Sequence, residues 1–185
     1  MEKSKPAICV FCGSSFGTDP AFGDAARAIG AGIAGLGYAL VFGGGSPGLM
    51  GDVARAAREA GTTVEGILPD FLRAVEPPLT DGETTEIVPD LFVRKQKMID
   101  RAAGFVVLPG GLGTYDEFFE VLTAAQLGVH ARPIILVNVN GYFDSLEAML
   151  KASVQAGFVR QENLGLYRTA PDAKTALAML AEALR

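Results

Sequence analysis

Residues 105–117 read FVVLPGGLGTYDE, and this stretch decides the fold. Its first four residues, Phe105–Leu108, are continuously apolar and predict a buried strand. The run Thr114–Gln126 predicts a helix whose first turn begins at Thr114. The glycines between strand and helix lack a Cβ atom, so backbone N–H groups can approach an anion, which the helix dipole also favours. We therefore expect a phosphate at this loop, with the Thr114 hydroxyl free to cap the helix and to donate to a phosphate oxygen.

The rest of the chain repeats this alternation of short β-branched runs and longer amphipathic ones. The predicted strands are Ala7–Cys12, Ala39–Phe42, Thr63–Ile67, Thr85–Val88, Phe105–Leu108 and Pro133–Val137. The predicted helices run from Pro20, capped by Thr18 or Asp19, to about Gly35, and over Leu49–Ala60, Phe92–Ala102, Thr114–Gln126, Phe143–Ala156 and Ala173–Leu184. Most of these strands are continuously apolar, which is typical of sheets covered on both faces. The pattern predicts one α/β domain over residues 1–185, with a mainly parallel sheet and a ligand outside the carboxyl ends of its strands.

Composition narrows the function classes. The 185 residues carry a formal net charge of −5, which argues against nucleic acid as a partner because a phosphate backbone requires a basic face. The longest apolar runs, such as Ile134–Val137, are far too short to cross a bilayer, so no membrane contact is expected. The first residues contain no apolar stretch of signal-peptide length, and we expect a cytoplasmic protein.

The cysteines and the single histidine do not predict a metal or redox site. Cys9 and Cys12 form a C-x-x-C pair, but their odd spacing within a strand places them on opposite faces of the sheet. His130 lies in a loop before a strand, where a solvated side chain is expected. We predict no metal, no cofactor and no Ser-His-Asp triad.

A second glycine cluster, GGGSPGLMG, occupies residues 43–51. Gly43, Gly45 and Gly48 satisfy the G-x-G-x-x-G pattern, and Glu65 lies 20 residues after Gly45, near the position of a ribose-binding acid. The segment can therefore bind a dinucleotide, contact another nucleotide, or simply turn the chain from strand to helix. The absence of G-K-[ST] argues against a triphosphate-hydrolysing P-loop.

Two charged residues, Arg94 and Glu117, fall near the starts of helices that follow predicted strands. Taken alone, the basic run that contains Arg94 is typical of a solvated helix face. Glu117, taken alone, is typical of a first-turn surface carboxylate that stabilises a helix dipole. Because both helix starts lie at the carboxyl edge of the sheet, however, the two side chains should converge beside the glycine loops. A carboxylate next to a phosphate site is electrostatically unfavourable, because the two negative charges repel each other. Its presence there favours a chemical role for Glu117.

Four motifs together resemble the Lonely guy family of cytokinin riboside 5′-monophosphate phosphoribohydrolases, whose members are often labelled lysine decarboxylases. The family patterns P-G-G-x-G-T-x-x-E, R-K-x-x-M, F-C-G-S-S and G-G-G-x-x-G-L-M-G stand here at residues 109–117, 94–98, 11–15 and 43–51. The similarity of order and spacing runs from about residue 7 to residue 168.

The resemblance implies a Rossmann-like, doubly wound fold and a homodimer with sites near the subunit interface. It also implies cleavage of the N-glycosidic bond of a nucleoside 5′-monophosphate, which gives the free base and ribose 5-phosphate without a cofactor. By motif, Arg94 and Glu117 would be catalytic. The residues that would bind substrate are Ser14, Gly44, Gly45, Glu76, Lys95, Pro109, Gly110, Gly111, Gly113, Thr114 and Thr123. Many relatives carry Met-His ahead of the Arg-Lys motif, whereas this chain has Phe92-Val93, which leaves the preferred base open between adenine and a prenylated adenine.

The chemistry of this reaction suits the predicted site. Loss of the base builds positive charge on the ribose, which a nearby carboxylate stabilises, and the same carboxylate can deprotonate the attacking water. Two alternatives stay open: a non-catalytic carrier of a nucleotide or pterin-like cofactor on the same fold, and a dinucleotide-dependent oxidoreductase that uses the Gly43–Gly48 segment.

Overall fold

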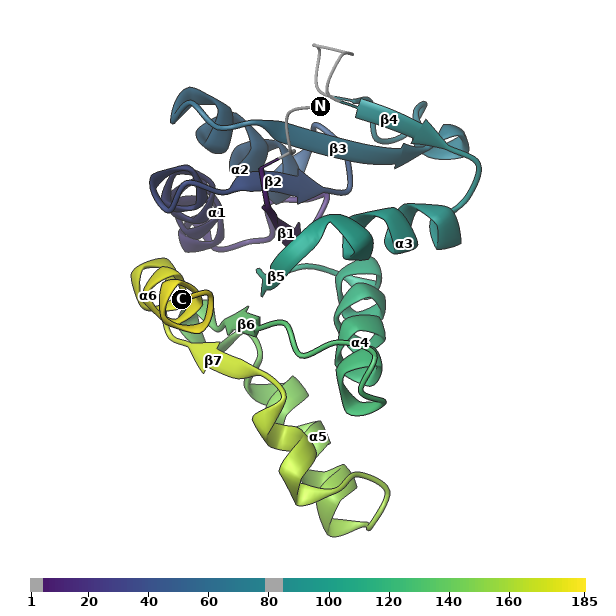
Figure 1. Cartoon of the computed structure of the whole chain (residues 1–185), viewed down its shortest axis with the longest axis vertical. Helices are drawn as coiled ribbons and strands as arrows, with labels where there is room; N and C mark the ends of the chain where they lie inside the picture. Colours follow the sequence, from purple (N-terminus) through teal and green to yellow (C-terminus); the bar gives the residue numbers. More distant parts are fainter. Residues whose placement is uncertain (1–4, 79–84) are drawn as a thin grey trace.

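The computed structural model describes residues 5–78 and 85–185. Seven parallel strands form one sheet in the order β4-β3-β2-β1-β5-β6-β7 (Figure 1). The strands are β1 (Ala7–Phe11), β2 (Ala39–Phe42), β3 (Val64–Pro69), β4 (Thr85–Val88), β5 (Ala102–Val107), β6 (Ile134–Val137) and β7 (Arg168–Ala170). The helices are α1 (Pro20–Gly35), α2 (Gly48–Glu59), α3 (Leu91–Arg101), α4 (Leu112–Gln126), α5 (Asp144–Gln155) and α6 (Ala173–Ala183). The predicted doubly wound α/β fold is confirmed.

The strand order reverses between β1 and β5, and this reversal positions the site. From β1 the chain adds strands toward β4, and after α3 it returns beside β1 and adds strands toward β7. The loops that leave β1 and β5 are therefore neighbours, and the Gly13 backbone N–H donates to the Pro109 carbonyl at 3.0 Å. In open parallel sheets, ligands bind in the crevice that such a reversal opens at the carboxyl ends of the strands.

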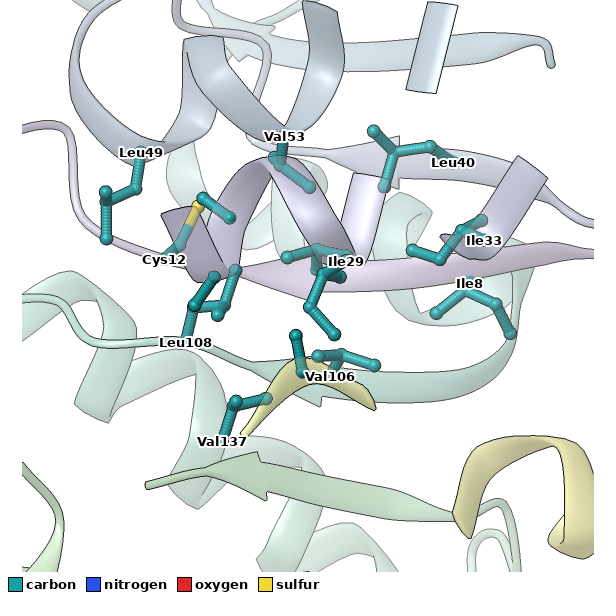
Figure 2. Packing of buried hydrophobic residues seen from close by; sticks show 14 of the residues in the cluster. Ile8, Cys12, Ile29, Ile33, Leu40, Leu49, Val53, Val106, Leu108 and Val137 are labelled. Atoms are coloured by element: carbon teal, nitrogen blue, oxygen red, sulfur yellow. The ribbon is translucent and has the colours of Figure 1, made fainter. Parts of the chain in front are cut away.

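Two hydrophobic cores cover the two faces of the sheet. On one face α1, α2 and α6 pack against side chains such as Ile8 and Val106 (Figures 1 and 2). On the other face α3, α4 and α5 pack around aromatic side chains that include Phe105 and Phe118. Cys12 belongs to the first core and Cys9 to the second, so the prediction that they lie on opposite faces is confirmed.

Element boundaries differ from the prediction where local signals are weak. Strand β7 was not predicted, because three residues at the edge of a sheet, two of them polar, carry no periodic pattern. Ala102 was placed in a helix, but α3 ends at Arg101 and the chain passes directly into β5. The start of α1 is as predicted: Asp19 is the N-cap, its side chain accepts from the Ala21 N–H at 2.9 Å, and Pro20 follows. Within the described residues, no helix combines the length and apolarity needed to span a membrane.

Candidate functional site

A cleft of about 290 Å³ opens at the carboxyl edge of the sheet, beside the reversal between β1 and β5. Its walls come from the loop after β1, the start of α2, the turn after β3, and the first turns of α3 and α4. The lining residues are Cys12, Gly13, Ser14, Met50, Leu72, Glu76, Leu91, Arg94, Gly111, Leu112, Gly113, Thr114 and Glu117. A larger cavity of about 550 Å³ surrounds His130 and Arg132 and contains none of the predicted site residues.

Arg94 and Glu117 meet in this cleft as a buried pair. The Arg94 Nη2 atom lies 3.5 Å from the Glu117 Oε1 atom, and each side chain is only 10% exposed. Arg94 comes from α3 and Glu117 from α4, so the two helices that follow β4 and β5 bring the charges together. The interpretations of Arg94 as a solvated helix face and of Glu117 as a surface carboxylate are therefore wrong.

The predicted start of α4 also needs correction. The helix begins at Leu112 rather than Thr114, with Gly111 as the N-cap and no side-chain capping bond. Thr114 is thus a buried residue inside the first turn, and Glu117 lies in the second turn. Glycine at an N-cap accepts the extended backbone without offering a side-chain oxygen, which leaves little signal in the sequence.

Burial sets the ionisation of Glu117. The pKa of its carboxyl group is raised from 4.5 to about 7, chiefly because the protein withdraws the group from water. Arg94 and Lys95 oppose this rise, whereas Asp116 and Glu76 add to it. A carboxyl group that titrates near neutral pH can accept a proton during a reaction and release it afterwards.

Arg94 retains hydrogen-bonding capacity for a ligand. Its Nε atom is buried and has no hydrogen-bond partner within residues 5–78 and 85–185. Buried donors are nearly always paired in folded proteins, so an unpaired donor in a cleft is a natural partner for a ligand oxygen.

The glycine loop before α4 lines one end of the cleft. Gly111, Gly113 and Thr114 line it at the start of the helix, where the first backbone N–H groups have no partner within the helix. Gly110 lies directly behind the loop, and a Cβ atom there would come within 2.1 Å of the Thr114 Oγ1 atom. Pro109 and Gly110 instead line an adjoining pocket of about 190 Å³ that shares Gly111 with the cleft.

The remaining predicted substrate-binding residues differ in how they lie relative to the cleft. Ser14 and Glu76 line the cleft, and Gly45 packs behind Glu76. Gly44 has a φ of +82° and packs against β3.

Lys95 and Thr123 lie outside the lining. The Lys95 Nζ atom binds Asp116 at 2.9 Å and Glu120 at 2.6 Å, both on α4, and Thr123 is exposed on the same helix.

Sequence reasoning missed six members of the lining: Cys12, Gly13, Met50, Leu72, Leu91 and Leu112. Four of them, Cys12, Gly13, Met50 and Leu112, fall inside the quoted motifs and could have been found there. Leu72 and Leu91 carry no signal of their own, because only the folded loop after β3 and the start of α3 bring them to the cleft.

The second glycine cluster is not arranged as a dinucleotide fingerprint. Glu65 lies near the amino end of β3, away from the cleft, and pairs with Arg101 at 3.1 Å. It is therefore not placed to bind a ribose beside Gly43–Gly48.

Comparisons with known proteins agree with the motifs. The family model described as "Possible lysine decarboxylase" matches residues 50–180. A rice protein named "Probable cytokinin riboside 5'-monophosphate phosphoribohydrolase LOGL9" is 44% identical over 176 residues, 95% of this chain and 77% of the rice protein. The Arabidopsis thaliana protein named "Cytokinin riboside 5'-monophosphate phosphoribohydrolase LOG3" is 42% identical over 185 residues, 98% of this chain and 85% of its own. The chain belongs to the Lonely guy family.

Solved structures of other proteins share the fold of this Lonely guy protein. The molybdenum cofactor binding protein of Rippkaea orientalis superposes with a TM-score of 0.74 at 20% identity and covers 100% of both chains. The molybdenum cofactor carrier protein of Chlamydomonas reinhardtii gives a TM-score of 0.70 at 22% identity, over 97% of this chain and 98% of its own. At these identities the likeness shows a shared fold, whereas the family follows from the plant relatives.

Proposed function

We propose that this protein hydrolyses the N-glycosidic bond of a purine nucleoside 5′-monophosphate, of the adenine or cytokinin type, to the free base and ribose 5-phosphate. The observation that carries the proposal is the buried Arg94–Glu117 pair beside the glycine loop at the start of α4 in one cleft. The names of the two plant relatives given above, which are 44% and 42% identical, support the same reaction.

The phosphate binds at the start of α4, which fixes the ribose against Glu117. The bond between C1′ and the base nitrogen breaks, its electron pair leaves with the base, and positive charge develops on the ribose. The Glu117 carboxylate stabilises this charge and takes a proton from the water whose oxygen attacks C1′. The departing base takes up a proton from solvent at its ring nitrogen, and Glu117 afterwards releases the proton that it took from water, so that charge is balanced over the cycle. Arg94 holds the carboxylate and binds a phosphate or ribose oxygen through its free Nε–H.

The base occupies the apolar end of the cleft. Met50, Leu72 and Leu91 supply a surface for the flat purine ring, and Glu76 offers a carboxylate that accepts from a base N–H or a ribose hydroxyl. The contacts around Leu91 decide whether a prenylated adenine is preferred, because this residue lies at the cleft wall and is 42% exposed.

The protein is proposed to be a cytoplasmic homodimer. The first turn of α3 exposes Leu91 and Phe92, and Leu112 at the start of α4 is 89% exposed, so an apolar rim surrounds the cleft. Met98, on the same helix, is fully buried and does not contribute to this rim. Light scattering should give about twice the 19.3 kDa chain mass at micromolar concentration, and a monomer would contradict the dimer.

Incubation with AMP, followed by chromatography for free adenine, tests the reaction. AMP should be cleaved and adenosine hardly at all, because binding of the remote phosphate positions the ribose. Calorimetry on the same preparation separates the outcomes. Tight binding of AMP without release of adenine would favour the carrier alternative, and equal turnover of AMP and adenosine would exclude a phosphate site at Gly111–Thr114.

A further inference from the structure

At each of the three glycines of the G-x-G-x-x-G pattern, other atoms of the protein fill the space that a Cβ atom would need. A Cβ atom at Gly43 would lie 1.8 Å from the Arg94 Nη2 atom, and one at Gly48 would lie 2.3 Å from the Ser14 carbonyl carbon. At Gly45 it would lie 2.9 Å from the Met50 methyl carbon. Arg94, Ser14 and Met50 all line the cleft, so each glycine makes room for a residue of its wall.

Gly43 is glycine because of this contact and not because of its backbone. Gly44 and Gly48 have φ values of +82° and +63°, which favour glycine, but Gly43 is not among the positive-φ residues. The three atoms nearest to its absent Cβ all belong to side chains: two to Arg94 and one, the Met50 sulfur at 3.2 Å, to its neighbour in the wall. A methyl group there would displace the end of a side chain rather than the chain itself.

The Arg94 guanidinium depends on this space. Its contact with Glu117 is a 3.5 Å ion pair, and its Nε atom has no partner among the described residues, so neither contact fixes the group as a bidentate bond would. Because Gly43 has no side chain, the guanidinium can lie close to the backbone at the end of β2. This close approach therefore determines how the guanidinium faces Glu117.

We propose that Gly43 is a positioning residue that seats the Arg94 guanidinium against Glu117, an inference that rests on the proposed hydrolase function. In Gly43→Ala, the methyl group pushes the guanidinium out of register with the carboxylate and the substrate. Misplacement of a catalytic group by about 1 Å can lower turnover by about 10²-fold. We expect a fall of that size in kcat for AMP, with a smaller rise in KM, because Arg94 supplies only part of the proposed substrate contacts and the loop after β5 that supplies the others is not touched by the methyl group.

Gly35→Ala is the matched control. Gly35 is exposed at the end of α1, no heavy atom lies within 4 Å of its absent Cβ, and its φ is not positive. This variant should hydrolyse AMP at the wild-type rate. Wild-type kcat in Gly43→Ala would overturn the proposal.

A double-mutant cycle with Arg94→Ala tests whether Gly43 acts through Arg94. Without the guanidinium the added methyl group has room, so Gly43→Ala should lower kcat no further in the Arg94→Ala background. Effects that multiply would show that Gly43 acts otherwise, and the proposal would fail. If Gly43→Ala folds only when Arg94 is also replaced, the steric contact is supported directly. If neither form folds, the backbone requires glycine and the proposal is wrong.

A readout independent of turnover separates this inference from the hydrolase function. In protein carrying ¹³C-labelled glutamate, the Glu117 carboxyl resonance is assigned by its loss in Glu117→Gln and is then titrated by NMR. The charged groups that act on Glu117 are Arg94 and Lys95, which lower its pKa, and Asp116 and Glu76, which raise it.

Displacing Arg94 should raise the pKa of Glu117 in Gly43→Ala and leave it unchanged in Gly35→Ala. If the wild type releases no adenine but this shift of the Glu117 pKa occurs, the proposed reaction fails and the positioning role of Gly43 is still supported. An unchanged pKa of Glu117 in Gly43→Ala would refute the positioning role even in an active enzyme.

Discussion

Glu117→Gln should lower activity and raise stability in the same preparation. The substitution keeps the size of the side chain but removes its charge and its basic oxygen. If Glu117 stabilises the ribosyl cation and deprotonates water, kcat for AMP should fall by about 10²–10⁴-fold. Binding of AMP should survive or tighten, because a negative carboxylate near a phosphate weakens the ground-state complex.

The expected gain in stability follows from burial. Native Glu117 holds its proton up to about pH 7, whereas the unfolded chain releases it near pH 4.5. Between these values the native state binds more protons than the unfolded state, so the free energy of unfolding falls as pH rises. The accumulated loss above pH 7 is up to about 3 kcal/mol, at 1.36 kcal/mol for each pH unit between the two pKa values.

A neutral glutamine escapes this loss. Thermal unfolding should therefore show matching melting temperatures at pH 4.5 and a Tm higher by about 5–10 °C for Glu117→Gln at pH 8. Asp116→Asn is the control, because Asp116 is on the same turn of α4 but 61% exposed, and its effect on Tm should be far smaller. A Tm that falls at every pH, or turnover equal to the wild type, would refute the assignment of Glu117 as a buried catalytic carboxylate.

Three further results are expected. The kcat/KM for AMP should rise with pH and level off above about pH 7, since Glu117 must be ionised to act as a base, and a profile that is flat through pH 6–8 would contradict this. Gly110→Ala should raise the KM for AMP and lower the free energy of unfolding by about 1–3 kcal/mol, because its Cβ atom would lie 2.1 Å from Thr114 Oγ1 and 2.7 Å from the Gly13 nitrogen. An unchanged KM with a normal Tm would show that the loop tolerates the methyl group. Lys95→Met should cost about 1 kcal/mol of stability by removing the two ion pairs to α4 while leaving the KM for AMP unchanged, and a large rise in KM would instead make Lys95 a substrate contact.

The sequence predicted the fold well because its signals are local and repeat. Short β-branched runs, most of them continuously apolar, located six of the seven strands, and the Asp19-Pro20 cap located the start of α1. Parallel strands with helical crossovers leave few topologies, so the alternation alone was enough to place two glycine loops at one edge of the sheet. The edge strand Arg168–Ala170 was missed because it is too short to show a pattern.

The site was predicted in outline but not in its geometry. The sequence placed Arg94 and Glu117 at one edge of the sheet, but only the fold shows that both are buried and 3.5 Å apart. The start of α4 was misjudged because a glycine N-cap leaves no side-chain signal, and this error alone made Glu117 look like a surface residue. The direction of Lys95 depends on carboxylates 21 and 25 residues away along the chain, which no local pattern specifies.

The charge balance of the cleft explains why Arg94 must be held in place. Glu117 is about half protonated at pH 7, because burial, Asp116 and Glu76 all favour its protonated form. A bound phosphate adds further negative charge nearby and shifts the same equilibrium toward the protonated form, which is the form that cannot accept a proton from water. The Arg94 guanidinium is the largest opposing influence, and its benefit depends steeply on its distance from the carboxylate. An arginine that drifted away when substrate arrived would leave Glu117 protonated at the moment when its basic oxygen is needed. In its proposed role, Gly43 leaves the space that the Arg94 guanidinium fills and so keeps this opposing charge beside the Glu117 carboxylate.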